Sequence, residues 1–157
     1  HAIMTQTQEP KAASNMWDSR FLKLAEHVAG WSKDPSTQVG AVIVDIDNRI
    51  VSTGYNGFPK GIKDTKGRLG NREKKLQYVI HAEHNAILFA NRSLVGCTLY
   101  VAPMMPCVRC ATVIIQTGIK RVVSTGPSKK LLERWGADME LTKEMFDEVG
   151  IEFIETF

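Results

Sequence analysis

The stretch from residue 81 to residue 124 reads HAEHNAILFANRSLVGCTLYVAPMMPCVRCATVIIQTGIKRVVS, and it decides the fold class. Segments with helical character, over 81–91 and 107–116, alternate with β-branched segments over 97–101 and 120–124. Gly118 marks the end of the second helix. Helices that alternate with strands in this way are typical of an α/β sheet. We therefore expect an α/β protein with helices on both faces of its sheet.

The segments outside this stretch add elements to the same sheet. Apolar residues at helical spacing predict a helix of about four turns from Met16 to Ala29. Residues 56–77 are rich in glycine and charge, and they predict a long loop of the kind that is often functional. The remaining expected elements are hairpin strands over 39–44 and 50–55, helices over 128–136 and 138–149, and a short strand over 151–154.

The composition indicates one globular domain. The chain has 157 residues, of which 43% are hydrophobic, and a net charge of +3. No apolar run approaches the roughly 20 residues of a membrane span, and the charge is too small to indicate a nucleic-acid partner. Three cysteines and the lack of a secretory pattern lead us to expect a cytoplasmic protein. We expect residues 1–14 to be an expression remnant followed by a mobile tail, and residues 15–157 to be the single domain.

Three residues of the central stretch form a candidate metal site. Cys107 and Cys110 are three residues apart in a first helical turn, so both sulfur atoms lie on one side. His81, at the start of the preceding helix, is placed to supply a nitrogen ligand and to leave the fourth tetrahedral position for water. Glu83 is then placed to move protons beside the ion. The pattern H-x-E followed by P-C-x-x-C is the signature of zinc-dependent nucleobase deaminases, with one catalytic Zn²⁺ per chain.

A structural zinc knuckle is the alternative interpretation of the same residues. His84 and His81 together with the two cysteines would make a closed set of four ligands, as in a non-enzymatic interaction module. That interpretation leaves Glu83 without a role and does not explain Pro106. Cys97, at the start of an apolar strand, is expected to be a buried hydrophobic residue.

Longer motifs resemble a known family. The runs HAEHNAI (81–87), PCVRC (106–110) and QTGIK (116–120) resemble the cytidine deaminase superfamily. Within it, SKDPSTQVGA (32–41) and GYNGFP (54–59) are similar to the deoxycytidylate (dCMP) deaminases. The resemblance implies a three-layer α/β/α fold with a five-stranded mixed sheet and a zinc-dependent deaminase domain. It also implies hydrolytic deamination of dCMP to dUMP and ammonia.

The resemblance also implies substrate contacts and partners. It places Asn56 near the sugar and phosphate and the backbone amide of Ala82 near the base carbonyl, although Asn56 between glycines also suits a turn with positive φ. Members of the family form homo-oligomers, so we expect a dimer, tetramer or hexamer. Several members are switched by dCTP and dTTP, but Ile62 stands where many relatives carry a cysteine, which argues against carrying this regulation over.

The phosphate anchor of the relatives is missing from this chain. They carry arginine before the Ser-Lys-Asp-Pro run, where this chain has Trp31. Seven Lys and Arg against two acidic residues lie between Gly57 and Tyr78, a net charge of +5, so the rest of the chain carries −2. We expect Lys60 and Arg68 of this basic segment to hold the phosphate instead.

Two other substrate classes fit the same signature. The loss of arginine at position 31 allows a related small substrate, such as deoxycytidine or a modified or purine base, and the charged loop allows an RNA substrate. Trp135 has two interpretations, a cap on the base or a core residue, and a lone tryptophan on a helix favours the core.

Overall fold

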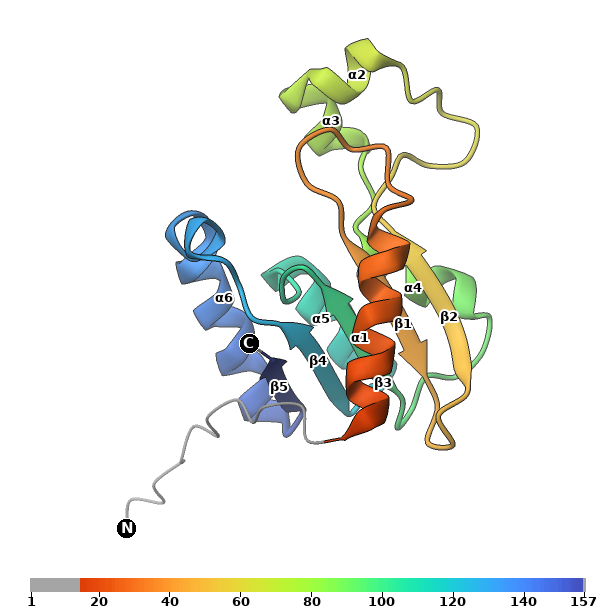
Figure 1. The fold of residues 1–157 in the computed structure, drawn as a ribbon, viewed down its shortest axis with the longest axis vertical. Coiled ribbons are helices and arrows are strands. Elements are labelled where there is room, and N and C mark those ends of the chain that lie inside the picture. The colour runs from red at the N-terminus through yellow and green to blue at the C-terminus, as the bar shows by residue number, and fades with distance from the viewer. Residues whose placement is uncertain (1–14, 157) are drawn as a thin grey trace.

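The computed structural model describes residues 15–156, so the expectation of a remnant and a tail over residues 1–14 lies outside it. Five strands form one mixed sheet in the order β2-β1-β3-β4-β5 (Figure 1). β1 pairs antiparallel with both β2 and β3, whereas β3, β4 and β5 run parallel. The strands are β1 (Gly40–Val44), β2 (Ile50–Tyr55), β3 (Thr98–Ala102), β4 (Arg121–Thr125) and β5 (Glu152–Thr156).

Helices cover both faces of this sheet and complete three layers. α1 packs on one face through a cluster that includes Phe21, Ala25 and Tyr100. α4, α5 and α6 pack on the other face, where Ala86, Ile114 and Phe146 share a second cluster with inward residues of the strands. The helices are α1 (Met16–Ala29), α2 (Lys66–Gly70), α3 (Arg72–Tyr78), α4 (Ala82–Ala90), α5 (Val108–Thr117) and α6 (Lys129–Val149). The expected α/β/α fold with a five-stranded mixed sheet is confirmed.

Two expectations about single segments are wrong. The segment 56–77 is not all loop, because α2 and α3 lie within it. Thr65 and Asn71 accept hydrogen bonds from the amides of Arg68 and Lys74, and these side-chain caps begin the two short helices. The helices expected over 128–136 and 138–149 are one continuous helix, α6, which passes through Gly136 without interruption.

Glycine allows α4 to lie close to the sheet. A Cβ atom at Gly54 on β2 would meet the carbonyl oxygen of Ala82 and the amide nitrogen of Ala86. Because the backbones touch here, the first turn of α4 is fixed directly against β2. Among residues 15–156, no helix is long and apolar enough to cross a membrane.

Candidate active site

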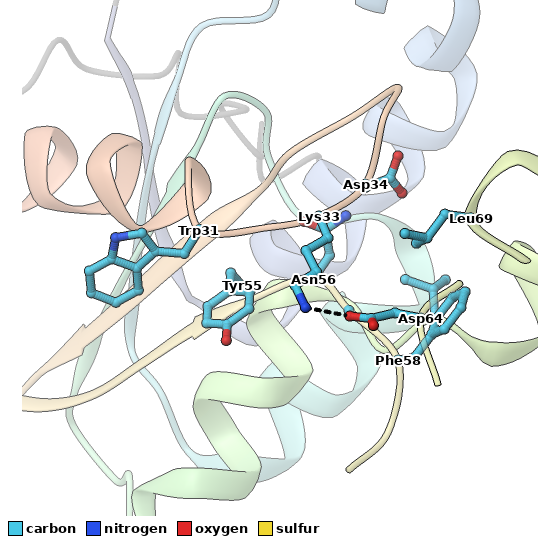
Figure 2. A pocket seen from close by; sticks show the side chains of 10 residues that line it. Trp31, Lys33, Asp34, Tyr55, Asn56, Phe58, Asp64 and Leu69 are labelled. Carbon is cyan, nitrogen blue, oxygen red and sulfur yellow. Dashed lines mark ion pairs between the residues drawn. The ribbon is translucent and has the colours of Figure 1, made fainter. Parts of the chain in front are cut away.

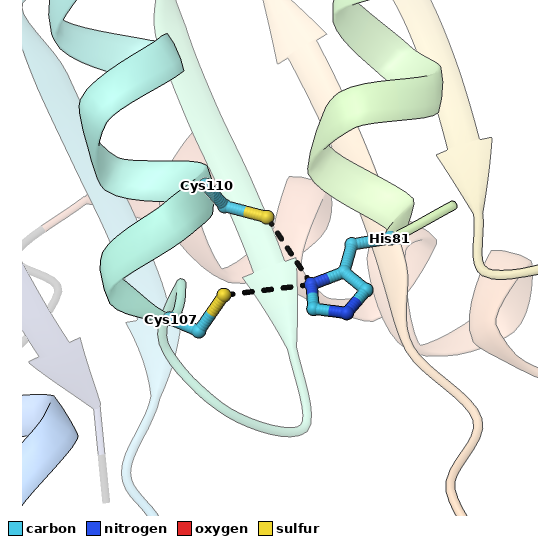
Figure 3. A group of neighbouring side chains, drawn as sticks. All are labelled: His81, Cys107 and Cys110. Carbon is cyan, nitrogen blue, oxygen red and sulfur yellow. Dashed lines mark hydrogen bonds between the residues drawn. The ribbon is translucent and has the colours of Figure 1, made fainter. Parts of the chain in front are cut away.

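The amino ends of α4 and α5 lie side by side on one face of the sheet (Figure 3). His81 is the N-cap residue of α4 and Cys107 is the N-cap residue of α5, and neither side chain caps its own helix. Both side chains are therefore free to meet between the helices. The positive ends of the two helix dipoles favour negatively charged thiolates at this position.

The three expected ligand atoms converge. His81 Nδ1 lies 3.5 Å from Cys107 Sγ and 3.3 Å from Cys110 Sγ (Figure 3). A tetrahedral zinc ion with ordinary Zn–N and Zn–S bond lengths holds such a pair of atoms about 3.5 Å apart. The residues therefore fit a zinc ion that keeps one position open for a fourth ligand, and the expected zinc cofactor is confirmed in this respect.

His84 does not join these ligands. Within the described part of the chain, the group that can hold a metal ion consists of His81, Cys107 and Cys110 alone. The site therefore has three protein ligands. An open site of this kind is typical of catalytic zinc rather than of a closed knuckle.

The ionisable groups around the ligand atoms shift one another. The hydrogen bond between the two thiols lowers the pKa of Cys107 and raises the pKa of Cys110, so that the pair favours one thiolate. The hydrogen bond to Cys107 in turn raises the pKa of His81. Glu83 is buried, with 4% of its surface exposed, and this burial raises the pKa of its carboxyl group. A carboxyl group with a raised pKa is suited to accept and release protons.

A cavity of about 580 Å³ opens onto these residues. Its lining includes His81, Ala82, Glu83 and Cys107 on one side and Arg72 and Lys75 of α3 on another. This volume lies in the range of small-molecule sites, and it exceeds what a bare zinc ion requires. The basic segment expected to serve the site thus reaches it through α3.

Asn56 lies at the edge of this cavity but is already well bonded. Its Oδ1 accepts a hydrogen bond from the Val39 amide at 2.9 Å, and its Nδ2 donates to the Thr37 carbonyl at 2.9 Å. The interpretation of Asn56 as a turn residue with positive φ is wrong, because positive φ outside glycine occurs, among residues 15–156, at Asn48 and Asn91. The side chain ties the segment before β1 to the end of β2.

Lys60 and Arg68 lie away from the cavity lining. The Lys60 ammonium group lies 4.6 Å from the centre of the Phe89 ring. The Arg68 guanidinium donates to the Lys63 carbonyl at 3.1 Å and lies 5.5 Å from the centre of the Tyr78 ring. The structure therefore does not bring these two expected phosphate anchors to the metal ligands.

A smaller pocket of about 150 Å³ shares Asn56 with the main cavity. Figure 2 shows Trp31 and Tyr55 on one side of it and the ion pair of Lys33 with Asp64, at 3.0 Å, on the other. The rings of Trp31 and Tyr55 meet edge to face. The tryptophan that replaces the arginine of the relatives thus lines this second pocket rather than the main cavity.

Several residues of the cavity differ from those that the sequence favours. Trp135 is not a core residue: 37% of its surface is exposed, and it lines the cavity together with Arg134 and Asp138 of α6. Arg109 lines it as well, and its place inside the P-C-x-x-C motif is a signal that sequence reasoning had available. No local pattern marks the residues of α6, because the packing of α6 against α5 alone brings them to the site.

α6 also holds the turn that carries Cys107. The Val108 amide donates to Asp138 Oδ2 at 3.2 Å, and the Thr142 hydroxyl donates to the Pro106 carbonyl at 3.0 Å. Asp138 thereby supplies the cap that Cys107 does not give to α5. These two bonds fix the backbone on both sides of the first thiol ligand.

Comparison with known proteins places this site in a family. Residues 15–125 match the family described as the cytidine and deoxycytidylate deaminase zinc-binding region. The chain is 48% identical over 136 residues to an uncharacterized deaminase in the luxG 3′ region of Aliivibrio fischeri, covering 87% of this chain and 90% of that protein. It is 43% identical over 148 residues to a probable deoxycytidylate deaminase of Drosophila melanogaster, covering 87% of this chain and 70% of that protein.

Two further comparisons agree. The human deoxycytidylate deaminase is 45% identical over 113 residues, which cover 68% of this chain and 63% of the human protein. The crystal structure of a dCMP deaminase from the cyanophage S-TIM5, in complex with dCMP and dUMP, superposes with a TM-score of 0.69 at 24% identity, covering 88% of this chain and 95% of the other. At 24% identity, the similarity to the cyanophage structure shows the fold alone.

The fold is a mixed sheet between two layers of helices, and neighbouring helix starts bring one histidine and two cysteines together beside a buried glutamate. This combination defines the class of zinc-dependent nucleobase deaminases. The chain belongs to the cytidine and deoxycytidylate deaminase family. The resemblance seen in the sequence motifs is thereby confirmed.

Proposed function

We propose that the protein hydrolyses the exocyclic amino group of dCMP and releases dUMP and ammonia. The observation that carries this proposal is the convergence of His81, Cys107 and Cys110 at zinc-ligand spacing beside the buried carboxyl group of Glu83. The choice of dCMP is supported by two relatives, one named probable deoxycytidylate deaminase at 43% identity and one named deoxycytidylate deaminase at 45% identity. The cavity of about 580 Å³ has room for a nucleotide.

The proposed reaction needs metal ligands and a group that transfers protons. His81, Cys107 and Cys110 would hold the zinc ion, which, when bound, makes a water molecule acidic enough to attack near neutral pH. Glu83 would accept one proton from the attacking water molecule as the water oxygen bonds to C4 of the cytosine ring, and it would pass this proton to the ring nitrogen N3. Glu83 would then take the second proton from the hydroxyl group now on C4 and pass it to the amino group. The C4–N bond breaks, ammonia leaves, the C4 carbonyl of dUMP forms, and N3 keeps the first proton. Burial of Glu83 suits it to both transfers because it raises the pKa of the carboxyl group.

One backbone amide and one side-chain amide are proposed to orient the substrate. Ala82 is the first residue of α4 and is buried at the cavity, so its amide lies among the helix-start amides that have no partner within the helix. We assign this amide to the carbonyl oxygen of the base. Asn56 Nδ2 uses one of its two hydrogens for the Thr37 carbonyl, and we assign the other to the sugar.

The protein is further proposed to act as a homo-oligomer. Leu88 and Phe89 on the outer side of α4 are 57% and 48% exposed, and such large apolar side chains favour burial against another copy of the chain. Light scattering coupled to size exclusion gives the number of chains in solution. A dimer, tetramer or hexamer is expected, and a monomer at assay concentrations would contradict the proposal.

A panel of substrates tests the proposed reaction. The zinc-loaded protein is mixed in turn with dCMP, deoxycytidine, free purine bases and a short RNA, and ammonia release is followed together with the change in ultraviolet absorbance. We expect turnover of dCMP to exceed that of every other compound, and we expect it to stop when zinc is removed by a chelator. Faster turnover of a purine base or of the RNA would show that the substrate assignment is wrong.

A further inference from the structure

Four Lys and Arg side chains line the cavity, and one of them already forms an ion pair. Lys75 Nζ lies 3.2 Å from Asp34 Oδ1 and 2.7 Å from the Ser36 hydroxyl. Arg72, Arg109 and Arg134 are the others. Within the described part of the chain, no ion pair includes any of these three arginines. Three guanidinium groups are therefore available to an anionic ligand.

The acidic groups of the same cavity do not neutralise these three arginines. Asp34 pairs with Lys75, and Asp138 accepts the hydrogen bond of the Val108 amide. Glu83 is buried beside the metal ligands. The cavity thus keeps unpaired positive charge next to the position where a base would react. A planar guanidinium group binds a phosphate through two parallel hydrogen bonds, which makes phosphate the anion that arginine suits best.

Arg109 and Arg134 belong to the wall of the cavity that α5 and α6 form. Arg109 stands between Cys107 and Cys110 in the sequence and lies in the first turn of α5. Arg134 lies one helical turn before Asp138 on α6, so the two share a face of that helix. Because Asp138 is bonded to the Val108 amide, this face of α6 is held against the start of α5.

Trp135 supports Arg134 in this position. The Arg134 guanidinium carbon lies 5.2 Å from the centre of the Trp135 ring, within the range of a cation–π contact. The ring itself lines the cavity. A guanidinium group resting on a ring loses less freedom when it binds a phosphate than one that moves freely.

We propose that Arg109 and Arg134 bind the 5′-phosphate of the substrate, that Trp135 positions Arg134, and that this subsite selects a nucleoside monophosphate over the free nucleoside. The inference rests on the proposed deamination of dCMP. It assigns to α5 and α6 the phosphate contact that Trp31 cannot make and that the sequence alone assigned to Lys60 and Arg68.

Substitution of the two arginines tests the subsite. Arg109→Gln and Arg134→Gln are compared with wild type for kcat/KM on dCMP and on deoxycytidine, and zinc content is measured for each protein. We expect each change to raise the KM for dCMP about tenfold or more, and the double change to raise it about 100-fold. The KM for deoxycytidine should stay within about twofold, because this substrate has no phosphate.

Arg20→Gln is the matched control. Arg20 also rests on a tryptophan, with its guanidinium carbon 4.7 Å from the centre of the Trp17 ring, but it lies on α1 across the sheet. This variant should keep the wild-type preference for dCMP. Trp135→Ala should raise the KM for dCMP, whereas Trp135→Phe, which keeps an aromatic face under Arg134, should restore most of the affinity.

Binding of dUMP and deoxyuridine, measured by calorimetry, separates this inference from the proposed reaction. If wild type does not turn over dCMP but binds dUMP more tightly than deoxyuridine through the two arginines, the reaction is wrong and the subsite stands. If wild type turns over dCMP and the arginine variants keep its preference, the subsite is overturned. It is likewise overturned if Lys60→Gln and Arg68→Gln raise the KM for dCMP instead, or if wild type binds both ligands equally.

Discussion

His81 and His84 lie one helical turn apart at the start of α4, yet only His81 reaches the two thiols. His81 is the N-cap residue, so its backbone is still extended and its ring points between the helices. His84 is inside the helix and faces elsewhere. The difference between a three-ligand site and a closed four-ligand site therefore depends on where α4 begins.

Exchange of each histidine tests this difference. His81→Ala removes one of three ligands and is expected to lower zinc from about one ion per chain to well below that after dialysis. His84→Ala should keep the full zinc content, because His84 does not meet the ligand atoms. Zinc is measured by atomic emission and folding by circular dichroism. Loss of zinc from folded His84→Ala protein would support the closed knuckle instead.

The sequence was informative about single residues where the chemistry is local. The spacing of His81, Glu83, Cys107 and Cys110 follows from two helix starts, and the structure brings the three ligand atoms together as this spacing predicts. Trp135 and Asp138 reach the cavity only because α6 packs on α5. Such contacts between distant segments leave no periodic pattern in the sequence, which is why the sequence favours the core over a base cap for Trp135.

At the scale of elements, the contact of α4 with β2 places His81, a candidate metal ligand, and Glu83, the proposed proton carrier. The contact requires glycine at position 54, because any side chain there would strike the backbone of Ala82 and Ala86. The short helices α2 and α3 form another wall of the cavity, and Thr65 and Asn71 begin them. Capping residues of this kind signal short helices in a sequence, but glycines and charges obscured the signal here.

Gly54→Ala is expected to destabilise the protein. The added methyl group has no room against the first turn of α4, so the helix must shift, at a cost of about 3 kcal/mol in the free energy of unfolding. Gly57→Ala is the control, since no atom lies within 4 Å of a Cβ atom built at Gly57 and its φ is not positive. Urea unfolding gives both values. Equal stability of the two variants would contradict the close packing of α4 on β2.

At the scale of the whole molecule, one buried ion pair joins α1 to β4, which lies 103 residues further along the chain. Asp18 on α1 is fully buried and accepts hydrogen bonds of 2.6 Å from Arg121 on β4 and from the Tyr100 hydroxyl on β3. Burial opposes the charge of Asp18, but the hydrogen bonds from Arg121 and Tyr100 outweigh it and lower the pKa of Asp18. A carboxyl group with a lowered pKa stabilises the fold above its unfolded pKa, and this contribution is lost as pH falls through the folded pKa.

Asp18→Asn is therefore expected to lose stability in a pH-dependent way. At pH 7 the change leaves Arg121 without its buried partner and should lower the free energy of unfolding by about 3 kcal/mol. The difference from wild type should persist down to the ordinary carboxyl pKa of 3.8 and shrink below it, as Asp18 of the wild type becomes protonated. Urea unfolding of both proteins between pH 3 and pH 7, in steps of about one pH unit, measures the difference in the free energy of unfolding. A constant difference across the range would show that the charge of Asp18 does not matter.

The layered α/β/α arrangement was predictable because it follows from the alternation of helices and strands after residue 80. The position of the basic side chains relative to the cavity was predictable only in part. The basic segment between Gly57 and Tyr78 does approach the site, but through Arg72 and Lys75 rather than through Lys60 and Arg68. Net charge along the sequence indicates that a segment is basic, whereas the direction of each side chain depends on helix starts and packing.

The role of Glu83 in proton transfer is the central claim, and Glu83→Gln tests it most directly. This change keeps the size of the side chain and all three metal ligands while it removes the group that carries protons. Ammonia release from dCMP and zinc content are measured on the same preparation. We predict about one zinc ion per chain and a rate at least about 10³-fold below wild type. A zinc-loaded Glu83→Gln protein that deaminates dCMP at the wild-type rate would contradict the mechanism.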